Sequence, residues 1–465
     1  MKKIFLFFTF FVIQNSFSSE IYKINLAKNE KLEGTFSIVT NKTESAHFLF
    51  IKNTSTDKYE MRPYFFSANK KITPLEIFSL DEMPIIIANH TNDNIITLIS
   101  YEEKSKKLFI IDFDIISGKN YFSVKSDYKK PKINFSQTNL SVLVRTIDSG
   151  KEIAIETISN SNKSDITNFK PTESFFKEFR NASNNDPQAI NQNEFVENGS
   201  IQNDRVYLSQ NKVYFTHFKD DEKTQVFKLN LTDHSSSFSD FNFNFPKNSK
   251  DQNSYIFDDN LLAVSSSKED VILNKYDLNT NQLSSGLSLS KDLTSVLDKN
   301  EVEKFLFEAK KGNLKTTAVV NKTKNNKLKI RLGIVNKSTY NYYYNWWWHH
   351  DFMMQQMQMQ QMHQMQQSVP RGFGPNNSID EGDLLFEKEK KYPQIEFLVD
   401  LDFKPQIDSK EETENKYFDK DAILKEFEEN KTIKKFSSAF LDTEIRYIHQ
   451  DSKTKAITIN FKTIE

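Results

Sequence analysis

A strand–turn–strand unit recurs along the chain and constrains its fold more than any other feature. Each copy has an alternating apolar strand, a polar turn and a second short strand. The copies occupy Leu108–Phe122, Val226–Phe238 and Val271–Leu283. Repeats at a fixed spacing are typical of solenoids, propellers and arrays, in which one supersecondary unit packs against the next. The recurrence predicts an all-β repeat architecture and gives no activity by itself.

Alternation of apolar and polar residues predicts eight β-hairpins after residue 20. Several start about 45 to 55 residues apart, which matches one four-stranded propeller blade. The expected strand pairs are Ala46–Lys52 with Tyr59–Phe66, Ile95–Tyr101 with Leu108–Ile115, Ser141–Ile147 with Glu152–Ile158, Lys212–Lys219 with Thr224–Leu231, Leu261–Ser266 with Val271–Leu278, Lys315–Lys322 with Leu328–Val335, Leu384–Lys388 with Ile395–Phe403, and Glu444–Gln450 with Ala456–Ile464. We therefore expect an all-β chain that forms a β-propeller of seven or eight blades over residues 20–465. Tandem β-sandwich modules are the alternative.

Both ends of the repeat region have strand-like sequences. Glu20–Leu26 alternates near the N-terminus, and Ala456–Ile464 alternates at the C-terminus. A ring of blades commonly builds one blade from both termini, because this removes an exposed sheet edge. The expected place of Glu20–Leu26 is therefore beside the C-terminal strand.

The turns carry a resemblance to known proteins. The sequence of Tyr276–Leu283 is Tyr-Asp-Leu-Asn-Thr-Asn-Gln-Leu. Asp114–Lys119 looks like the same turn, and Val399–Phe403 matches it less closely. This pattern resembles bacterial β-propellers of the WD-repeat-like and quinoprotein-like kinds. A short side-chain acceptor ties such a turn, and Gly or Asn tolerates its positive φ. The chain has no Trp-Asp dipeptide, and its three Trp are residues 346–348, which argues against a true WD-repeat protein or a quinone-binding dehydrogenase.

Three longer segments interrupt the hairpins, and loops of this length are usually functional or disordered. They are residues 171–204, 340–380 and 408–431. Short helices are expected within the first and third, at Glu173–Arg180 and Asp421–Glu428, where the apolar residues have helical spacing.

The N-terminus predicts export. Lys2 and Lys3 precede an apolar run at Ile4–Ile13, and Gln14–Ser19 supplies small and polar residues near a cleavage point. This is the pattern of a secretory signal over residues 1–19. The run is too short to cross a bilayer as a helix, and no later stretch is suited to crossing one. The expected location is the periplasm or the cell exterior.

Composition excludes several classes of function. The chain has no Cys, so disulfides, thiolate metal sites and Cys nucleophiles are excluded. Its 62 Lys and Arg against 63 Asp and Glu give a net charge of -1, which provides no field to attract nucleic acid or anionic lipid.

The segment Tyr340–Gln367 has an unusual composition. It holds all three Trp, six of the nine Met and three of the eight His. Thioether and imidazole groups suit Cu(I) or Ag(I). The candidate ligands are Met353, Met354, Met357, Met359, Met362, His363 and Met365, with His349 and His350 beside them. The Met side chains spread around a helix instead of forming one stripe, and Met-rich surfaces also suit protein contacts. Metal binding, partner contact and a low-complexity tract without a defined role all remain open.

The sequence contains no nucleophile elbow, zinc-protease helix or phosphate-binding glycine loop. Single histidines in or near strands, at positions 47, 90, 217 and 449, are expected to be structural. The acidic turns Asp220–Glu222 and Asp258–Asp259 are expected to be solvated hairpin tips rather than calcium sites. The sequence thus favours a non-enzymatic binding or scaffold protein with an unidentified protein partner. The alternatives are a periplasmic soft-metal binder and, at a lower rank, a propeller hydrolase or lyase with a dispersed site.

Overall fold

The computed structural model describes residues 19–147, 152–171, 187–196, 199–219, 223–243, 251–309, 314–336, 392–406 and 432–463, with six single positions at 245, 249, 311, 424, 427 and 430. The chain divides into two compact units. Unit 1 contains Met1–Met83, Asp114–Asn120 and Phe427–Glu465, and unit 2 contains Pro84–Phe113 and Tyr121–Glu426.

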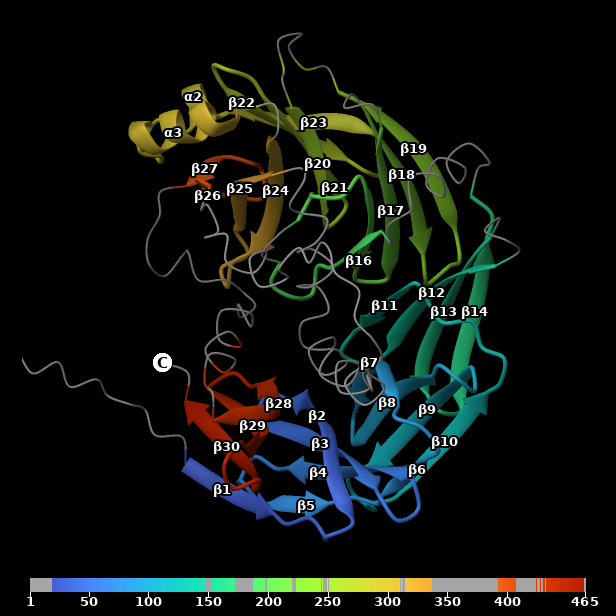
Figure 1. The fold of residues 1–465 in the computed structure, drawn as a ribbon. Helices are drawn as coiled ribbons and strands as arrows, with labels where there is room; N and C mark the ends of the chain where they lie inside the picture. The colour runs from blue at the N-terminus through green and yellow to red at the C-terminus, as the bar shows by residue number, and fades with distance from the viewer. Residues whose placement is uncertain are drawn as a thin grey trace, which may run out of the picture. The chain divides into compact units, whose positions relative to one another are not determined.

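One sheet of unit 1 takes its strands from both ends of the chain. Its order is β1 (Ser19–Ile24), β30 (Ile457–Thr463), β29 (Glu444–Asp451) and β28 (Ile433–Phe440). β1 runs antiparallel to β30, with Ser19 opposite Phe461 and Ile24 opposite Ile457. Figure 1 shows the N-terminal strand beside the C-terminal one. The expected pairing of the two ends is confirmed, and it places β30 between two partner strands.

The second sheet of unit 1 contains β2 (Glu30–Asn41), β3 (Glu44–Asn53), β4 (Lys58–Phe66) and β5 (Ile72–Pro74), and β6 (Phe78–Leu80) also pairs with β4. The two sheets share one apolar core. Leu49 and Ile51 of β3 pack with Ile448 of β29 and with Ile457 and Ile459 of β30. Burial of these side chains, each of which stabilises the fold by roughly 1.5–3 kcal/mol, holds unit 1 together.

Unit 2 contains five sheets. The first contains β7 (Ile85–Asn92), β8 (Ile95–Glu102), β9 (Lys107–Asp114) and β10 (Asn120–Lys125), and its β9–β10 turn falls in unit 1; the second contains β11 (Ile133–Ser136), β12 (Ser141–Ile147), β13 (Glu152–Asn160) and β14 (Lys163–Phe169). The third sheet has five strands, β15 (Gln188–Asn191), β16 (Asp204–Ser209), β17 (Lys212–Lys219), β18 (Lys223–Asn230) and β19 (Ser236–Asn242). The fourth contains β20 (Asp251–Phe257), β21 (Asn260–Ser266), β22 (Val271–Asp277) and β23 (Gln282–Ser288), and the fifth contains β24 (Leu314–Lys322), β25 (Leu328–Asn336), β26 (Ile395–Val399) and β27 (Pro405–Gln406).

The described residues thus form seven sheets of four or five strands, and neighbouring strands in a sheet are mostly consecutive in sequence. A four-stranded meander is the blade unit of a β-propeller. The chain is all-β and propeller-like, as the sequence predicts. Seven of the eight expected hairpins are confirmed as neighbouring strands.

The eighth expected hairpin, Leu384–Lys388 with Ile395–Phe403, has its first strand outside the described residues. Its second strand, Ile395–Val399, pairs with β25, with Leu332 opposite Ile395. The insert at 340–380 is therefore an insertion inside one sheet, between its second and third strands.

Two further segments contain elements that the sequence did not predict. Gln188–Asn191, within the expected insert 171–204, forms β15 and runs parallel to β16. α2 (Leu289–Asp292) and α3 (Lys299–Ala309) lie between β23 and β24, where the sequence predicted no helix. The expected helix at 173–180 lies outside the described residues, as does the helix at 421–428 except for Leu424 and Phe427. Among the helices that the structure describes, none has the length and apolar character to cross a membrane.

The resemblance in the turns has a common geometry. Asp277 Oδ1 accepts hydrogen bonds from the backbone N–H groups two and three residues later, at 2.6 and 3.0 Å, and Asn281 has a φ of 59°. Asp114 does the same at 2.8 and 3.3 Å, and Gly118 has a φ of 73°. Asp451 repeats it at the β29–β30 turn. A short acceptor followed four residues later by a positive φ is the local signal that closes these hairpins.

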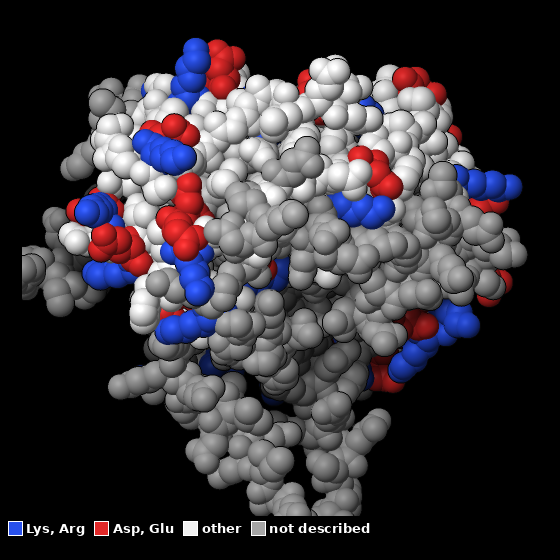
Figure 2. Space-filling model, turned by 90° about the horizontal axis from the view of Figure 1, so that it is seen from above, with Lys and Arg blue, Asp and Glu red and all other residues white. Residues whose placement is uncertain are grey.

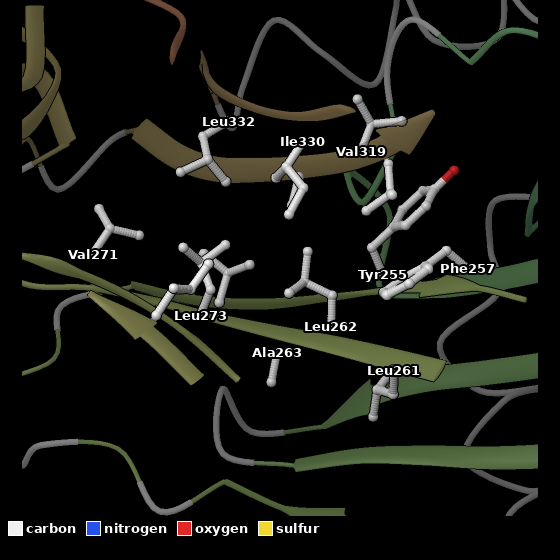
Figure 3. Packing of buried hydrophobic residues seen from close by; sticks show 14 of the residues in the cluster. Tyr255, Phe257, Leu261, Leu262, Ala263, Val271, Leu273, Val319, Ile330 and Leu332 are labelled. Atoms are coloured by element: carbon white, nitrogen blue, oxygen red, sulfur yellow. The ribbon is translucent and has the colours of Figure 1, made fainter. Parts of the chain in front are cut away.

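The largest core of unit 2 takes side chains from the third, fourth and fifth sheets. In Figure 3, Leu262 of β21 points toward Ile330 and Leu332 of β25, whereas Leu261 and Ala263 point to the opposite face of β21. This alternation is the period of two from which the strands were predicted. It explains why β21 is buried almost throughout, since both of its faces are covered.

Candidate functional site

The candidate soft-metal ligands are not placed by the structure. Met353, Met354, Met357, Met359, Met362, His363 and Met365, together with His349 and His350, all lie outside the described residues. Among the described residues, no group of three or more His, Asp or Glu side chains is arranged to hold a metal ion.

The strand histidines make internal contacts, as the sequence predicts. Each described imidazole of this set has a side-chain or backbone partner within its own unit. The partners are Ser37 and Ser45 for His47, Ser141 and the Ser159 carbonyl for His90, Asp204 for His217, and Asn460 for His449. These contacts favour structural roles over catalytic ones.

One histidine of unit 1, His47, nevertheless has serine neighbours like those of a catalytic histidine. His47 Nδ1 lies 2.7 Å from Ser37 Oγ, Ser37 Oγ lies 2.8 Å from Ser437 Oγ, and His47 Nε2 lies 3.1 Å from Ser45 Oγ. His47 is fully buried. Burial, and then the charge of Arg446, lower the pKa of His47 to about 3. A general base works best with a pKa near the working pH, so this imidazole is a poor base for activating Ser37.

Arg446 has a structural role in the same region. Its guanidinium donates to the carbonyl of Thr43 at 2.8 Å and to that of Phe66 at 2.9 Å, and its Nε donates to Glu444 at 2.6 Å. The side chain is 2% exposed. It links β29 to the ends of β3 and β4, which joins the two sheets of unit 1.

The acidic turn Asp258–Asp259 is occupied by the protein's own cations. Lys322 lies 2.8 Å from Asp258, and Lys212 lies 2.6 Å from Asp259. Burial raises the pKa of the Asp259 carboxyl, but hydrogen bonds from Lys212 and Tyr214 hold it below its usual value. The carboxylates are therefore paired with ammonium groups in place of an added cation. The other acidic turn, at 220–222, lies outside the described residues.

The most distinctive exposed feature is strand β10. Tyr121, Phe122 and Val124 are 51%, 55% and 41% exposed, although they are large apolar side chains. β10 is an end strand, with β9 on one side and no described strand on the other. Alternate residues of a strand face opposite sides, so Phe122 and Val124 share one face and Tyr121 lies on the other. We call these three residues the β10 surface. Sequence analysis predicted this strand but not its exposure.

Interactions at both ends fix β10. At its start, the backbone N–H of Asn120 donates to Glu76 Oε2 at 2.9 Å. At its end, the ammonium group of Lys125 pairs with Glu156 and donates to Ser164 Oγ at 2.9 Å. Glu156 is fully buried and also contacts Arg145 at 3.3 Å. The apolar side chains are therefore presented from a strand held at both ends.

Equivalent end strands of unit 2 lack such a cluster. β14 exposes one large apolar side chain, Ile166, and β23 exposes one, Leu283, while β19 exposes none of this class. On the face seen in Figure 2, Lys and Arg side chains lie interspersed with Asp and Glu. The β10 surface is thus distinguished from these end strands by its three exposed apolar side chains.

Comparisons with known proteins identify no family. No family model and no curated protein matches the chain. Among solved structures, the β-propeller domain of the Trilobed protease from Pyrococcus furiosus is 10% identical over 93% of this chain and 96% of that one, with a TM-score of 0.32. The WD40 domain of SCAP from fission yeast is 8% identical over 93% and 97%, with a TM-score of 0.28.

Another similar structure is prolyl oligopeptidase B from Galerina marginata, at 10% identity and a TM-score of 0.27. The match covers 67% of this chain and 47% of that protein, so this chain spans about half the length of that enzyme. These similarities are too low to transfer an activity, a substrate or a partner.

Proposed function

We propose that this chain is an exported, non-enzymatic binding protein whose β10 surface docks an extended apolar segment of a partner protein. The observation that carries the proposal is the exposure of three large apolar side chains on one end strand, with Phe122 and Val124 on one face and Tyr121 on the other. Singly exposed apolar residues are normal on soluble proteins, but a cluster commonly marks an interaction site.

Strand addition is the binding mode that suits this edge. An end strand offers backbone N–H and C=O groups to an incoming strand, and apolar side chains beside it provide the specificity. Aromatic residues such as Tyr121 and Phe122 dominate the energetics of many interfaces, because they bury a large area with few rotatable bonds. Since Asn120 and Lys125 are already fixed, little ordering of β10 opposes binding.

The histidine contacts support a non-enzymatic role. The arrangement closest to a catalytic one is His47 with Ser37, and its imidazole is fully buried with a pKa of about 3. An imidazole of this kind stays neutral and weakly basic at neutral pH, so it does not supply a general base.

Substituting the β10 surface should remove partner binding without unfolding the protein. In the variant Tyr121→Ser, Phe122→Ser, Val124→Ser, the lost side chains are half-exposed, so the melting temperature should stay close to that of the wild type. Loss of such anchors typically costs about 2 kcal/mol or more, roughly a 30-fold rise in Kd. Quantitative mass spectrometry of cross-linked complexes from periplasmic extract measures the effect.

The matched control is Ile166→Ser with Leu283→Ser, which removes exposed apolar residues from two other end strands. Proteins recovered by the wild type and the control, but depleted at least tenfold with the β10 variant, would support the proposal. Equal recovery with all three proteins would contradict it.

We also propose that residues 1–19 are a signal removed on export, because the charged and apolar regions there have the required order. The mature chain is then expected to begin near Ser18–Glu20 and to be soluble. That start retains most of β1, whose pairing with β30 begins at Ser19. N-terminal sequencing of the folded protein from the periplasm tests this, and an intact Met1 on most molecules would show that no signal is removed.

A soft-metal site in the 340–380 insert is the second candidate function, favoured by the concentration of Met and His there. The insert joins β25 to β26, which pair directly through residues such as Leu332 and Ile395. Replacing 340–380 with a short Gly/Ser linker should therefore preserve the fold, because loop length changes closure entropy slowly.

In that replacement variant we expect an unchanged circular dichroism spectrum, a similar melting temperature and the loss of Cu(I) or Ag(I) uptake. Metal analysis of the purified wild type and variant, after loading with Cu(I), provides the readout. Insoluble variant protein would place the Tyr and Trp cluster of the insert in the core. Equal metal content in both proteins would exclude the insert as the binding site.

A further inference from the structure

The edge of β10 lacks the protection that proteins usually give to an end strand. Charged residues, Pro and bulges on such a strand hinder pairing with another chain. β14 carries Lys163 and Asp165, β19 carries Asp240, and β23 meets β22 through a register irregularity. The stretch Asn120–Val124 of β10 contains no charged residue and no Pro, and it exposes three large apolar side chains. A strand of another molecule can therefore add to this edge.

The sequence of β10 is suited to pairing with a second copy of itself. Two copies of one strand that meet edge to edge under two-fold symmetry run antiparallel, and each side chain stays on its own face of the combined sheet. Opposite residues are then both even-numbered or both odd-numbered, so the axis passes beside one residue of the strand. Phe122 and Ser123 are the two centres that overlap most of Asn120–Lys125.

The apolar pattern selects Ser123 as the centre. This centre sets Phe122 of each copy opposite Val124 of the other, so that four apolar side chains form one cluster on a single face. Directly opposite side chains are the pairs that stabilise a sheet. With Phe122 as the centre, Val124 would instead lie opposite the polar side chain of Asn120.

The remaining residues agree with the centre at Ser123. Tyr121 lies opposite Lys125, whose methylene stem can cover the ring while its ammonium group stays with Glu156. Lys119 just before the strand then lies toward Asp127 just after it, which brings opposite charges together beyond both strand ends. With Phe122 as the centre, Lys119 would lie opposite Lys125, and opposed like charges are destabilising.

We propose that β10 pairs with β10 of a second copy of this chain, antiparallel and centred on Ser123, to form a two-fold dimer. The inference rests on the proposed function in one respect, namely that the edge of β10 is a binding surface. Two strands of six residues bury a small area, and interfaces below about 1,200 Å² are typically weak and transient. The dimer therefore covers this edge until a tighter partner strand displaces the second copy.

The first test is the association state of the purified chain. Sedimentation equilibrium over a concentration series should show a reversible monomer–dimer equilibrium without larger species, because a two-fold pairing is closed. Phe122→Ser removes both Phe–Val pairs of the dimer and should raise its Kd about tenfold or more. The control Leu283→Ser removes a similarly exposed apolar side chain from β23 and should keep the wild-type Kd.

The second test measures the register. The chain has no Cys, so one introduced Cys is its only thiol. Phe122→Cys and Val124→Cys are prepared with different tags, and a short thiol-to-thiol crosslinker is added to each variant alone and to their mixture. With the centre at Ser123, crosslinks should form several-fold more efficiently between the two variants than within either one, because identical positions are then only diagonal neighbours. Leu283→Cys measures crosslinking by random collision.

Two results would overturn the inference: a wild-type chain that stays monomeric at every concentration, or equal crosslinking in the mixture and within the single variants. This inference and the proposed function fail separately. If the purified chain is monomeric and the β10 variant still loses partners in periplasmic extract, only the second copy is excluded. If the predicted crosslinks form and no other protein depends on β10, only the docking of another protein is excluded.

Discussion

Deleting residues 456–465 is expected to unfold unit 1. The deletion removes β30, which lies between β29 and β1, and leaves β1 without its strand partner. Ile457 and Ile459 are fully buried in the core shared by both sheets. Losing one buried Ile costs about 2–5 kcal/mol, and the total stability of a domain is about 5–15 kcal/mol. Thermal unfolding followed by circular dichroism should lose the transition of this unit.

The control for that deletion removes only residues 464–465, which leaves β30 complete at Thr463. Its melting curve should match that of the full chain. A 456–465 deletion that melts like the wild type would show that the two chain ends do not depend on each other.

The second large effect is acid destabilisation through His47. Its folded-state pKa is about 3, against a usual value of 6.5. The unfolded state therefore binds a proton at a higher pH than the folded state. The contribution of the neutral His47 to the free energy of unfolding is complete above pH 6.5 and is lost as the pH falls toward 3. The loss amounts to about 2 kcal/mol at pH 5 and about 4 kcal/mol at pH 3.5.

Two variants isolate this titration in urea unfolding at pH 7 and pH 5. His47→Gln removes the titrating group, so its stability should fall by about 2 kcal/mol less than that of the wild type between these two values. Ser45→Ala removes a hydrogen bond to His47 but keeps the imidazole, so it should retain the pH dependence of the wild type. A His47→Gln variant with the wild-type pH dependence would place the acid sensitivity elsewhere.

Local sequence signals predicted most of the strands for a physical reason. In a strand, alternate side chains face opposite sides, so the pattern in Leu261–Ser266 identifies β21 without knowledge of its neighbours. Turn residues such as Asp277 and Asn281 close a hairpin through contacts within five residues. Pairing of the two chain ends also followed from the sequence, because a blade otherwise lacks its outer strand.

Pairings across long insertions were not predictable in this way. β26 and β25 are separated by residues 337–394, so no local pattern in the sequence links the two strands. Helix α3 was missed although a signal was present. Asp298 caps it by accepting from the N–H of Asn300 at 2.8 Å, and Phe305, Leu306 and Ala309 are buried on one side. The alternation of the surrounding strands hid that helical spacing.

Clusters of side chains from distant strands were not predictable from the sequence. His47 and Arg446 are separated by most of the chain, and Arg205 meets Tyr255 through a neighbouring sheet. The exposure of Phe122 depends on β10 being an end strand, which is a property of the sheet. The sequence predicted the strand but not the binding surface.

Site-specific photo-crosslinking tests the proposed binding role most directly. A photoreactive amino acid replaces Phe122 on β10 in one protein and Leu283 on β23 in a second, since both positions are about equally exposed, at 55% and 56%. Crosslinking in living cells, followed by mass spectrometry, identifies what contacts each position. The account predicts one protein partner, joined through an extended apolar segment, at position 122 and not at 283. The same products at both positions, or no product at 122, would contradict it.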